Sequence, residues 1–506
     1  RGDKNGQAAS YSYPTSDLPC AKVCIAGDAN GDGDIDWNDG ALAFRDIMNI
    51  AQGAEDIKDL VNYRIVMNFA GMATNPYLET ADNIKKVYLA TDGLPQAVML
   101  KGYGNEGHDS ANSEYADVSE REGGITDFQN LIKIAHQYNT EVGIHINAQE
   151  AYPEAKSFNE TMLTSPITNG WGWLDQSFTI NKLWDLGSQA RYKRLVQLYD
   201  RINGTSFYSG NWDKGEYVKD SQGTLNASMS EIAADAAKRT DNMDFIYLDV
   251  WYQNAWETRQ IAKEINSLGW RFSTEFGYEG EYDSTWSHWA TDAAYGGASL
   301  KGWNSEIIRF LRNDQRDTQI LNYPKYGGTA DNPLLGGYRL YGFEGWGGDQ
   351  DYNSYITETF TENLPTRFLQ HYYVTDWEDY GEDEDCPTGN TEKQITLKND
   401  TGDTVVVTRN TEQRSDSYIE RTITLNGKEV LNDVKYLLPW TDENGDQKLY
   451  HWNLDGGTST WELPDGWTNL ANVVMYELSD QGRINEKTVA VSNGSVTLDA
   501  KAATAY

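Results

Sequence analysis

The sequence predicts an α/β fold, in which a (β/α)8 barrel of the TIM type is followed by a β-sandwich domain and preceded by a loop–helix element. Three observations predict this order. An acidic loop precedes a helical stretch near the start, apolar strands alternate with amphipathic helices from about residue 62 to 350, and short strands follow from about residue 385. A chain of 506 residues has room for about two to four domains. We predict three, at 1–60, 61–385 and 386–506, with the first packed on the barrel.

The N-terminal element contains the stretch "GDANGDGDIDWNDGALAFR". Oxygen-bearing side chains stand at loop positions 1, 3, 5, 7, 9 and 12, and a glycine stands at position 6, where the loop turns sharply. This spacing is typical of a Ca²⁺ loop, because alternate oxygen ligands converge on a hard cation. An acidic turn without metal is the alternative. We predict a structural calcium site with the ligands Asp28, Asn30, Asp32, Asp34 and Asp39.

The middle of the chain alternates between β-prone runs and helical stretches, which is typical of parallel βαβ units. Helical periodicity is clear at 127–138, 189–202 and 255–268. About eight such units in this length favour a closed barrel over an open sheet. The predicted strands are 63–70, 96–102, 141–147, 244–250, 270–276, 290–296 and 339–346, with another near 318–324.

The last part of the chain lacks helical periodicity. Runs such as "DTVVVTRN" and "EKTVAVSNG" alternate apolar and polar residues, and Asn-Gly turn signals stand at 426–427 and 493–494. Several short strands separated by turns predict an all-β sandwich.

Composition limits the partners of this chain. Asp and Glu total 77 against 42 Lys and Arg, which gives a formal net charge of −35. So acidic a surface repels phosphate backbones, and we predict no nucleic-acid binding. No apolar run of about 18 residues is present, so we predict no membrane insertion. The chain starts at Arg1, and we expect any secretion signal to lie outside this sequence.

Two residue types leave alternatives open. Cys20, Cys24 and Cys386 are too few for a disulfide framework, and the redox state of the first two stays open. The 17 Trp and 32 Tyr residues are unusually many. Some of them pack in cores, but Trp and Tyr also stack on the C–H faces of sugar rings. Composition alone allows both interpretations.

Two carboxyl groups stand at the ends of consecutive predicted strands. Asp249 ends one strand and Glu275 the next, 26 residues later. The C-terminal strand ends of a (β/α)8 barrel build its active site, and glycoside hydrolysis uses one carboxylate at the anomeric carbon and one carboxylic acid at the leaving oxygen. A separation of about 5–5.5 Å would give retention and about 6.5–9.5 Å inversion. The structural alternatives are a loop cap for Asp249 and a salt bridge to Arg271 for Glu275.

Aromatic residues border this pair of carboxyl groups. Apolar neighbours are expected to raise the pKa of one carboxyl and keep it protonated as a general acid. Trp171 and Trp173 lie in the Gly-rich stretch "NGWGW", and we interpret them as a mobile stacking lid rather than as core residues. Trp346 ends the last predicted strand, where it floors the pocket or plugs the barrel.

Polar residues follow two other predicted strands. Asp109 follows His108 in a loop, where it binds sugar hydroxyls or is an ordinary turn residue. His145 and Asn147 end a further strand, and we predict them as second-rank substrate-binding residues. A histidine in such a place is more often packed and hydrogen-bonded than functional. No Ser-His-Asp grouping, P-loop or zinc spacing emerges from the sequence.

The wording and order of several motifs resemble the endo-α-N-acetylgalactosaminidases of glycoside hydrolase family 101. The matching segments include the calcium loop, "KGYGNEGHDSA", "GIHINAQEAYPEA", "GWGWLDQ", "IYLDVW" and "GWRFSTEFGYEGEYDSTWSHWATDAAYGG", over about residues 27–346. The resemblance implies that Asp249 is the nucleophile and Glu275 the general acid/base. It also implies that His108 and Asp109 bind substrate, and that Trp171 and Trp173 close over the sugar.

The residues predict a glycosidase, and the resemblance implies a retaining endo-glycosidase that releases Galβ1-3GalNAc (core 1) from Ser or Thr of mucin-type glycoproteins. We expect it to act outside a bacterial cell or at its surface. One alternative is another retaining α-glycosidase on the same barrel, which aryl glycosides would distinguish. The other is a non-catalytic carbohydrate-binding or adhesion protein, which would retain glycans without hydrolysing them. The sequence does not indicate an oligomeric state.

Overall fold

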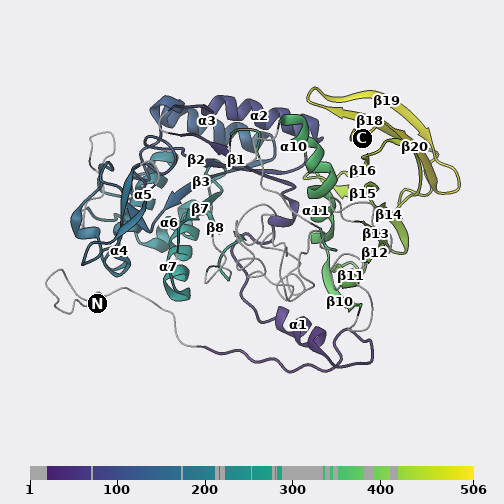
Figure 1. The fold of residues 1–506 in the computed structure, drawn as a ribbon, viewed down its shortest axis with the longest axis horizontal. Helices are drawn as coiled ribbons and strands as arrows, with labels where there is room; N and C mark the ends of the chain where they lie inside the picture. The colour runs from purple at the N-terminus through teal and green to yellow at the C-terminus, as the bar shows by residue number, and fades with distance from the viewer. Residues whose placement is uncertain are drawn as a thin grey trace.

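The computed structural model describes residues 20–69, 72–172, 175–210, 216, 223–251, 253–275, 280, 282–287, 334–336, 342–345, 351–380, 392–410 and 420–506. A parallel sheet occupies the first half of the chain and an antiparallel sheet the last part. Figure 1 shows helices α10 (Tyr352–Glu358) and α11 (Leu364–Gln370) between the two sheets. The π-helical turn η7 (Thr359–Asn363) joins these two helices.

Six parallel strands form the first sheet, in the order β1-β2-β3-β7-β8-β9. Their bounds are Asn62–Met67, Gln96–Lys101, Thr140–Asn147, Phe245–Asp249, Arg271–Thr274 and Trp286–Ser287. The first five confirm predicted strands, whereas β9 was not predicted. On the other edge of the sheet, the backbone N–H of Met67 donates a 3.2 Å hydrogen bond to the carbonyl oxygen of Glu344.

This last contact bears on whether the sheet closes into a barrel. It brings residues 342–345 alongside β1, as closure through the predicted strand 339–346 requires, although no strand is assigned to these four residues. The predicted strands 290–296 and 318–324 lie outside the described residues. The parallel α/β arrangement is therefore confirmed, and closure into eight strands stays a prediction.

Helices cover the outer face of the parallel sheet. They are α2 (Tyr77–Ala90), α3 (Gly124–Gln137), α5 (Ala190–Asn203), α6 (Met229–Ala236) and α7 (Ala255–Asn266), and their buried faces share one core with the outward strand residues. Helix α4 (Lys182–Ser188) packs on α5. The described 3-10 turns are η1 (Ile57–Asp59), η2 (Glu120–Glu122) and η3 (Glu160–Met162). In α3, Phe128, Leu131 and Ile132 recur at helical spacing and are buried on one face. The three helices predicted from periodicity are confirmed to within a few residues.

The two faces of the sheet bury different sets of side chains because side chains alternate along a strand. On β7, Ile246 and Leu248 pack outward against the helices. Phe245 and Tyr247 point inward, into a second core inside the sheet. Gly143 on β3 makes room for this inner core, since a Cβ there would lie 2.2 Å from the ring of Phe245. Every second residue of a strand therefore points inward, and the last of these residues lies at the C-terminal end of the sheet.

A small antiparallel sheet follows β3. Its strands β4 (Glu150–Ala151), β6 (Gln176–Thr179) and β5 (Asn169–Gly172) lie in that order. Glu150 pairs with Thr179 in this sheet. The insertion thus begins three residues after the end of β3 and carries the predicted aromatic lid.

The antiparallel sheet has seven strands in sequence order, followed by two two-stranded pairs, β17-β20 and β18-β19. Tyr436 and Leu438 on β15 pack in the core that also holds Phe360. Leu437 between them packs in another core, with Trp461 and Leu498 from β17 and β20. The strands β10 to β20 are Tyr373–Asp379, Glu392–Lys398, Thr404–Arg409, Arg421–Leu425, Lys428–Asn432, Lys435–Thr441, Gln447–Asn453, Gly457–Glu462, Asn472–Ser479, Gly482–Ala490 and Ser495–Ala500. The first of them precedes the predicted boundary at 385/386.

The N-terminal helix α1 (Trp37–Arg45) packs against the antiparallel sheet, whereas we predicted that it packs on the barrel. Ala41 and Met48 belong to the core shared by α11 and that sheet, and the Arg45 guanidinium lies 4.9 Å from the ring centre of Tyr373. The following segment then reaches the domain of the parallel sheet, where the Asn49 side chain donates to the carbonyl oxygen of Tyr282 at 2.6 Å.

Candidate active site

Three neighbouring strands bring polar side chains together at their C-terminal ends. The residues of these strands that point into the sheet's interior lie side by side on adjacent strands. Lys101, His145 and Asp249 continue the inward rows of β2, β3 and β7, beyond the apolar residues of the inner core. Asn147 on β3 pairs directly with Asp249 on β7. All four side chains are buried. The C-terminal end of the sheet therefore carries the polar cluster that the sequence predicts there.

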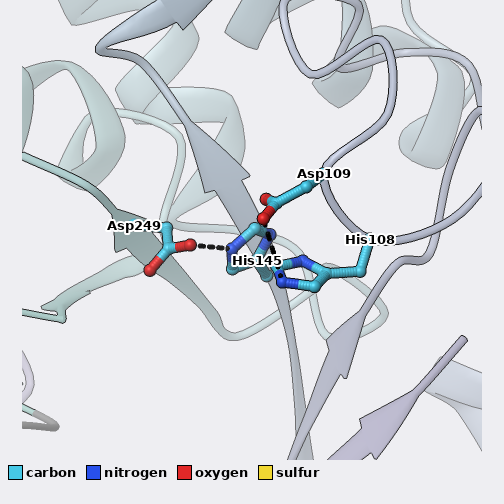
Figure 2. A group of neighbouring side chains, drawn as sticks. All are labelled: His108, Asp109, His145 and Asp249. Atoms are coloured by element: carbon cyan, nitrogen blue, oxygen red, sulfur yellow. Dashed lines mark hydrogen bonds and ion pairs between the residues drawn. The ribbon is translucent and has the colours of Figure 1, made fainter. Parts of the chain in front are cut away.

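Asp249 is held as a carboxylate by its neighbours. Its Oδ2 accepts a 2.7 Å hydrogen bond from His145 Nε2 (Figure 2), and Lys101 Nζ lies 4.0 Å from the same oxygen. Burial alone would raise the pKa of Asp249, but the charges of Lys101 and His145 outweigh it and lower this pKa well below its usual value. The second oxygen, Oδ1, is buried and has no hydrogen-bond partner among the described residues.

Glu275 follows β8 and lies beside the same strand end. Its backbone N–H donates to the carbonyl oxygen of Leu248 at 3.0 Å, and its Oε2 accepts a 3.0 Å hydrogen bond from the backbone N–H of Val250. Burial, and then the negative charge of Asp249, raise the pKa of Glu275 to about 10. Glu275 is therefore protonated at neutral pH.

The alternative roles considered for these two carboxyl groups do not fit this geometry. Arg271 does not pair with Glu275, because its guanidinium donates to Glu141 at 2.6 Å, at the start of the strands. Asp249 accepts its hydrogen bond from a side chain on another strand rather than from its own loop. One ionised and one protonated carboxyl at the same strand ends match the two roles in glycosidic bond cleavage.

His108 and Asp109 lie in the loop after β2. Gly102 has a φ of +94°, and a Cβ there would lie 2.2 Å from the carbonyl oxygen of Asn68, so glycine lets the loop pass close to β1. The backbone N–H of His108 donates to this Asn68 carbonyl oxygen at 2.9 Å. The loop is thereby folded back over the strand ends, with both side chains buried.

This loop brings two ring systems and two acids together. His108 Nε2 lies 3.2 Å from Asp109 Oδ2, and the rings of His108 and His145 meet edge to face at 4.8 Å (Figure 2). Burial, and then the nearby Asp249 charge, raise the pKa of Asp109. Burial and the charge of Lys101 lower the pKa of His108 well below its usual value. The structure thus places this predicted pair next to the nucleophile candidate.

Asn147 does not present its side chain to an open pocket. Its Oδ1 accepts from the backbone N–H groups of Gln149 and Glu150 at 2.8 and 3.0 Å, and its Nδ2 donates to Glu150 Oε2 at 2.9 Å. The predicted sugar-binding role of Asn147 stays a prediction. In this structure the residue joins the end of β3 to the insertion that follows.

Glu150 continues this connection to the predicted lid. Its Oε1 accepts a 2.5 Å hydrogen bond from the backbone N–H of Trp171, and Ser177 Oγ donates to the Trp171 carbonyl oxygen at 2.5 Å. Burial raises the pKa of Glu150. Trp171 is 59% exposed, as a stacking residue that waits for a ligand would be. Trp173 and Trp346 lie outside the described residues.

Sequence reasoning missed three residues of this site. Lys101 ends a strand just as Asp249 does, so its inward position on β2 was a usable signal. Glu150 is part of "GIHINAQEAYPEA" but falls after the strand, where no spacing marks it. Tyr152 is buried, and its hydroxyl has no hydrogen-bond partner among the described residues. Burial, and then the charges of Asp109 and Glu150, raise the pKa of Tyr152.

The predicted calcium loop folds closely on its own backbone. Asp28 accepts from the backbone N–H groups of Gly31 and Gly33 at 2.7 and 3.1 Å. Asp39 accepts from Ala29 and Asp36 at 2.5 and 2.8 Å. The side chains are oxygen donors, as Ca²⁺ prefers. In the described part of the chain, the Asp side chains of this loop do not bring three or more ligand atoms close together. Binding of Ca²⁺ therefore stays a prediction.

Comparisons with known proteins give consistent results. A family model described as endo-alpha-N-acetylgalactosaminidase matches residues 38–356. A second, described as the glycosyl hydrolase 101 beta sandwich domain, matches residues 362–484. A provisionally assigned endo-alpha-N-acetylgalactosaminidase from Renibacterium salmoninarum is 35% identical over 507 aligned positions, which cover 98% of this chain and 29% of that relative. The chain thus spans under a third of the curated relative's length.

Two solved structures have distant similarity to this chain. The alpha-N-acetylgalactosaminidase NagBb from Bifidobacterium bifidum, in complex with GalNAc, is 12% identical with a TM-score of 0.46, over 74% of this chain and 62% of the other. The maltogenic alpha-amylase AmyB from Thermotoga neapolitana is 10% identical with a TM-score of 0.39, over 89% of this chain and 99% of the other.

Proposed function

The chain belongs to the endo-alpha-N-acetylgalactosaminidase family of glycoside hydrolases, and from this membership we propose that it releases Galβ1-3GalNAc from Ser or Thr with retention. The observation that carries the proposal is the opposite protonation of two neighbouring carboxyl groups. The pKa of Asp249 is lowered well below its usual value, and that of Glu275 is raised to about 10. A retaining glycosidase needs this combination at neutral pH.

In the first step, Asp249 attacks the anomeric carbon of GalNAc while Glu275 gives its proton to the departing Ser or Thr oxygen. The C–O bond to the peptide breaks and an ester to Asp249 forms. His145 and Lys101 orient the attacking oxygen and keep it ionised before the attack. The peptide leaves with its hydroxyl restored.

In the second step, Glu275 takes a proton from water, whose oxygen attacks the anomeric carbon and releases Asp249. The change of role has a physical reason. Once Asp249 is esterified it carries no negative charge, and that charge is the second largest cause of the raised pKa of Glu275. Esterification therefore lowers this pKa, and Glu275 becomes able to act as a base.

The site around the two carboxyl groups supports an oligosaccharide substrate. Trp171 offers an exposed aromatic face, and Asp109 offers acceptors for sugar hydroxyls beside Asp249. We propose neutral O-glycans on mucin-like proteins as the partners of this enzyme, and an extracellular or cell-surface place of action. No helix in the described part of the chain is long and apolar enough to cross a membrane.

We also propose that the loop from Asp28 to Asp39 binds Ca²⁺ as a structural ion. Asp28, Asn30, Asp32, Asp34 and Asp39 would supply its oxygen ligands. The ion would join the loop to α1, whose other face packs on the antiparallel sheet. It takes no part in the reaction proposed above.

A synthetic peptide with one core 1 disaccharide on Thr tests the reaction. We expect mass analysis to find free Galβ1-3GalNAc and unmodified peptide, and proton NMR to find the α-anomer first. Aryl α-GalNAc and aryl α-galactosides are offered in parallel. Preferential hydrolysis of either of these would assign the chain to another α-glycosidase activity. Binding of the glycopeptide without any hydrolysis would instead support a carbohydrate-binding protein.

A further inference from the structure

Four buried side chains at the strand ends form a compact set of possible metal ligands. One ligand atom from each of His108, Asp109, His145 and Asp249 lies within 4.8 Å of every other (Figure 2). No second such group of three or more His, Cys, Asp or Glu side chains is found in the described part of the chain. Two imidazole nitrogens and two carboxylate oxygens are donors that Zn²⁺ accepts in four-coordinate sites.

We propose that these four side chains bind Zn²⁺, or a similar transition-metal ion, and that the bound ion inhibits the enzyme. Two of the ligand pairs are already in contact, since His145 Nε2 lies 2.7 Å from Asp249 Oδ2 and His108 Nε2 lies 3.2 Å from Asp109 Oδ2. Bond lengths to Zn²⁺ of about 2.0–2.2 Å set neighbouring ligands roughly 3.3 Å apart. Small side-chain movements would therefore let the ion take the place of these two direct contacts.

A second observation supports a cation at this position. Asp249 Oδ1 is buried without a hydrogen-bond partner among the described residues, so a metal ion on Oδ2 would leave this second oxygen available as a further ligand of the same ion. The set is unsuited to Ca²⁺ or Mg²⁺, because these ions require about six or more oxygen ligands. We therefore expect selectivity for Zn²⁺ over both.

One neighbouring charge opposes the metal. Lys101 Nζ lies 4.0 Å from Asp249 Oδ2, one of the proposed ligand atoms, so its positive charge would repel an ion bound there. Replacing Lys101 by a neutral residue should consequently tighten metal binding, which a general loss of structure would not do. Removing Lys101 should raise the affinity for Zn²⁺, whereas removing a ligand should lower it. The two kinds of variant therefore test the site independently.

Inhibition follows from what the ion would occupy. A metal ion on Asp249 Oδ2 uses the carboxylate that the proposed function assigns to the attack on the sugar. The inhibition should be competitive with glycopeptide. This consequence rests on the proposed function, whereas binding of the ion does not.

The test uses the full chain with Cys20→Ser and Cys24→Ser, so that these exposed thiols do not bind the metal, and with Ca²⁺ present throughout. Calorimetry with Zn²⁺ measures stoichiometry and affinity, and the visible absorption of Co²⁺ reports tetrahedral ligands. We expect one ion per chain. His145→Gln and Asp109→Asn should each weaken binding by at least about tenfold, and Lys101→Met should strengthen it.

The matched control is His136→Gln. His136 Nε2 lies 3.0 Å from Asp244 Oδ2, and both side chains are partly exposed. This pair lies outside the proposed site, so its variant shows whether Zn²⁺ binds adventitiously to a His–Asp pair. Its variant should bind Zn²⁺ as the parent does. Loss of binding in His136→Gln, unchanged affinity in both ligand variants, or no binding by the parent would each overturn the site. Binding without inhibition of an active enzyme would overturn the inhibitory role, and an inactive parent that still binds would contradict only the proposed function.

Discussion

Glu275 Oε2 accepts a 3.0 Å hydrogen bond from the backbone N–H of Val250, the residue directly after Asp249. The bond attaches the proposed acid to the strand end that carries the proposed nucleophile. Val250 has a φ of +48°, in the left-handed region that branched residues rarely adopt. Such backbone strain is typical of functional sites. The relative position of the two carboxyl groups is therefore set by backbone as well as by side chains.

The first prediction concerns turnover. Asp249→Asn and Glu275→Gln should each lower kcat/KM on core 1 glycopeptide by about 10³-fold or more, since each removes one of the two groups of the displacement. Asp244→Asn is the matched control, because Asp244 precedes the same strand β7 at its opposite end. It should keep nearly full activity. Thermal unfolding checks that all three variants fold, and normal turnover in either site variant contradicts the assignment.

The second prediction concerns the proton on Glu275. In Asp249→Asn the negative charge that helps to raise the pKa of Glu275 is absent, so this pKa should fall below its parent value of about 10. Infrared difference spectra of the carboxyl band, recorded from pH 5 to about 12, measure both values. Glu275→Gln identifies the band by removing it. An equal or higher pKa in Asp249→Asn would exclude the proposed change of role during the reaction.

The third prediction concerns stability. Glu275 has a pKa of about 10 in the folded chain and about 4.3 when unfolded. Its contribution to stability is therefore fully present below about pH 4.3 and is lost as pH rises toward 10. Gln does not ionise, so the Glu275→Gln variant does not lose this stability as pH rises. Its free energy of unfolding relative to the parent should rise by at least about 1 kcal/mol between pH 5 and pH 8, measured by urea unfolding. A difference that does not change with pH would indicate an unperturbed carboxyl.

The sequence was most informative where the period-two pattern of strands applies. Asp249 and His145 were found because they end apolar runs, and the structure brings them to 2.7 Å. Glu150 was not found, since its role depends on a hydrogen bond to Trp171 across 21 residues of an irregular insertion. Strand β9 was missed because only two residues, Trp286 and Ser287, form it. Tertiary contacts, rather than local pattern, determine such features.

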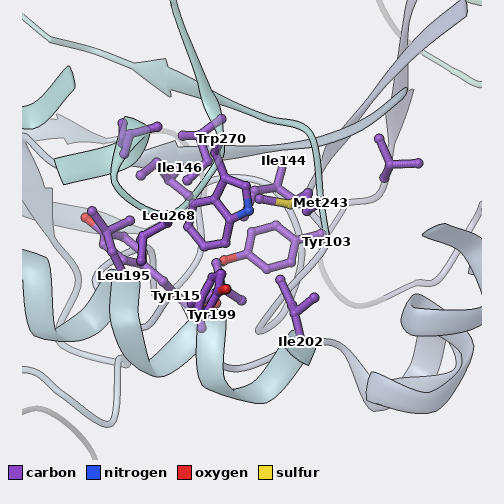
Figure 3. Close-up of a cluster of buried hydrophobic side chains, with 14 of the residues drawn as sticks. Tyr103, Tyr115, Ile144, Ile146, Leu195, Tyr199, Ile202, Met243, Leu268 and Trp270 are labelled. Carbon is purple, nitrogen blue, oxygen red and sulfur yellow. The ribbon is translucent and has the colours of Figure 1, made fainter. Parts of the chain in front are cut away.

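The abundant aromatic residues illustrate the same limit. Figure 3 shows Tyr103, Tyr115 and Trp270 packed among aliphatic side chains of the outer core. Their hydroxyl or indole groups bond inside the protein, as in the Tyr103 hydroxyl that donates to the Tyr115 carbonyl oxygen at 2.5 Å. Trp171 is exposed instead. Composition predicted that aromatic residues matter, but only burial separates core residues from candidates for sugar contact.

The fourth prediction concerns calcium. Ca²⁺ at about ten times its Kd should stabilise the chain by about 1.4 kcal/mol, because only the folded loop binds the ion. Scanning calorimetry should find a higher Tm with Ca²⁺ than with chelator. Asp28→Ala should abolish this shift, whereas Asp46→Asn, just beyond the end of α1, should keep it. A Tm that does not respond to Ca²⁺ in the parent would support the acidic turn without metal.

The fifth prediction concerns Glu150, which connects Asn147 on β3 to the backbone of Trp171. Glu150→Ala leaves the Trp171 N–H without its acceptor, so the tryptophan loses its position while Asp249 and Glu275 keep theirs. KM for core 1 glycopeptide should rise about five- to tenfold, as expected for about 1 kcal/mol or more of lost positioning, and kcat should change little. Tryptophan fluorescence should lose its response to bound disaccharide.

Two variants sharpen this prediction. Glu150→Gln keeps one carbonyl acceptor for Trp171 but sets an amide against the donating Nδ2 of Asn147, so it should restore KM only in part. Glu154→Ala removes an exposed carboxylate of the same segment and should leave KM unchanged. If kcat fell with KM unaffected in Glu150→Ala, the residue would act on the chemistry itself. An equal effect of Glu154→Ala would mean that the negative charge of this segment, rather than the hydrogen bond to Trp171, determines substrate affinity.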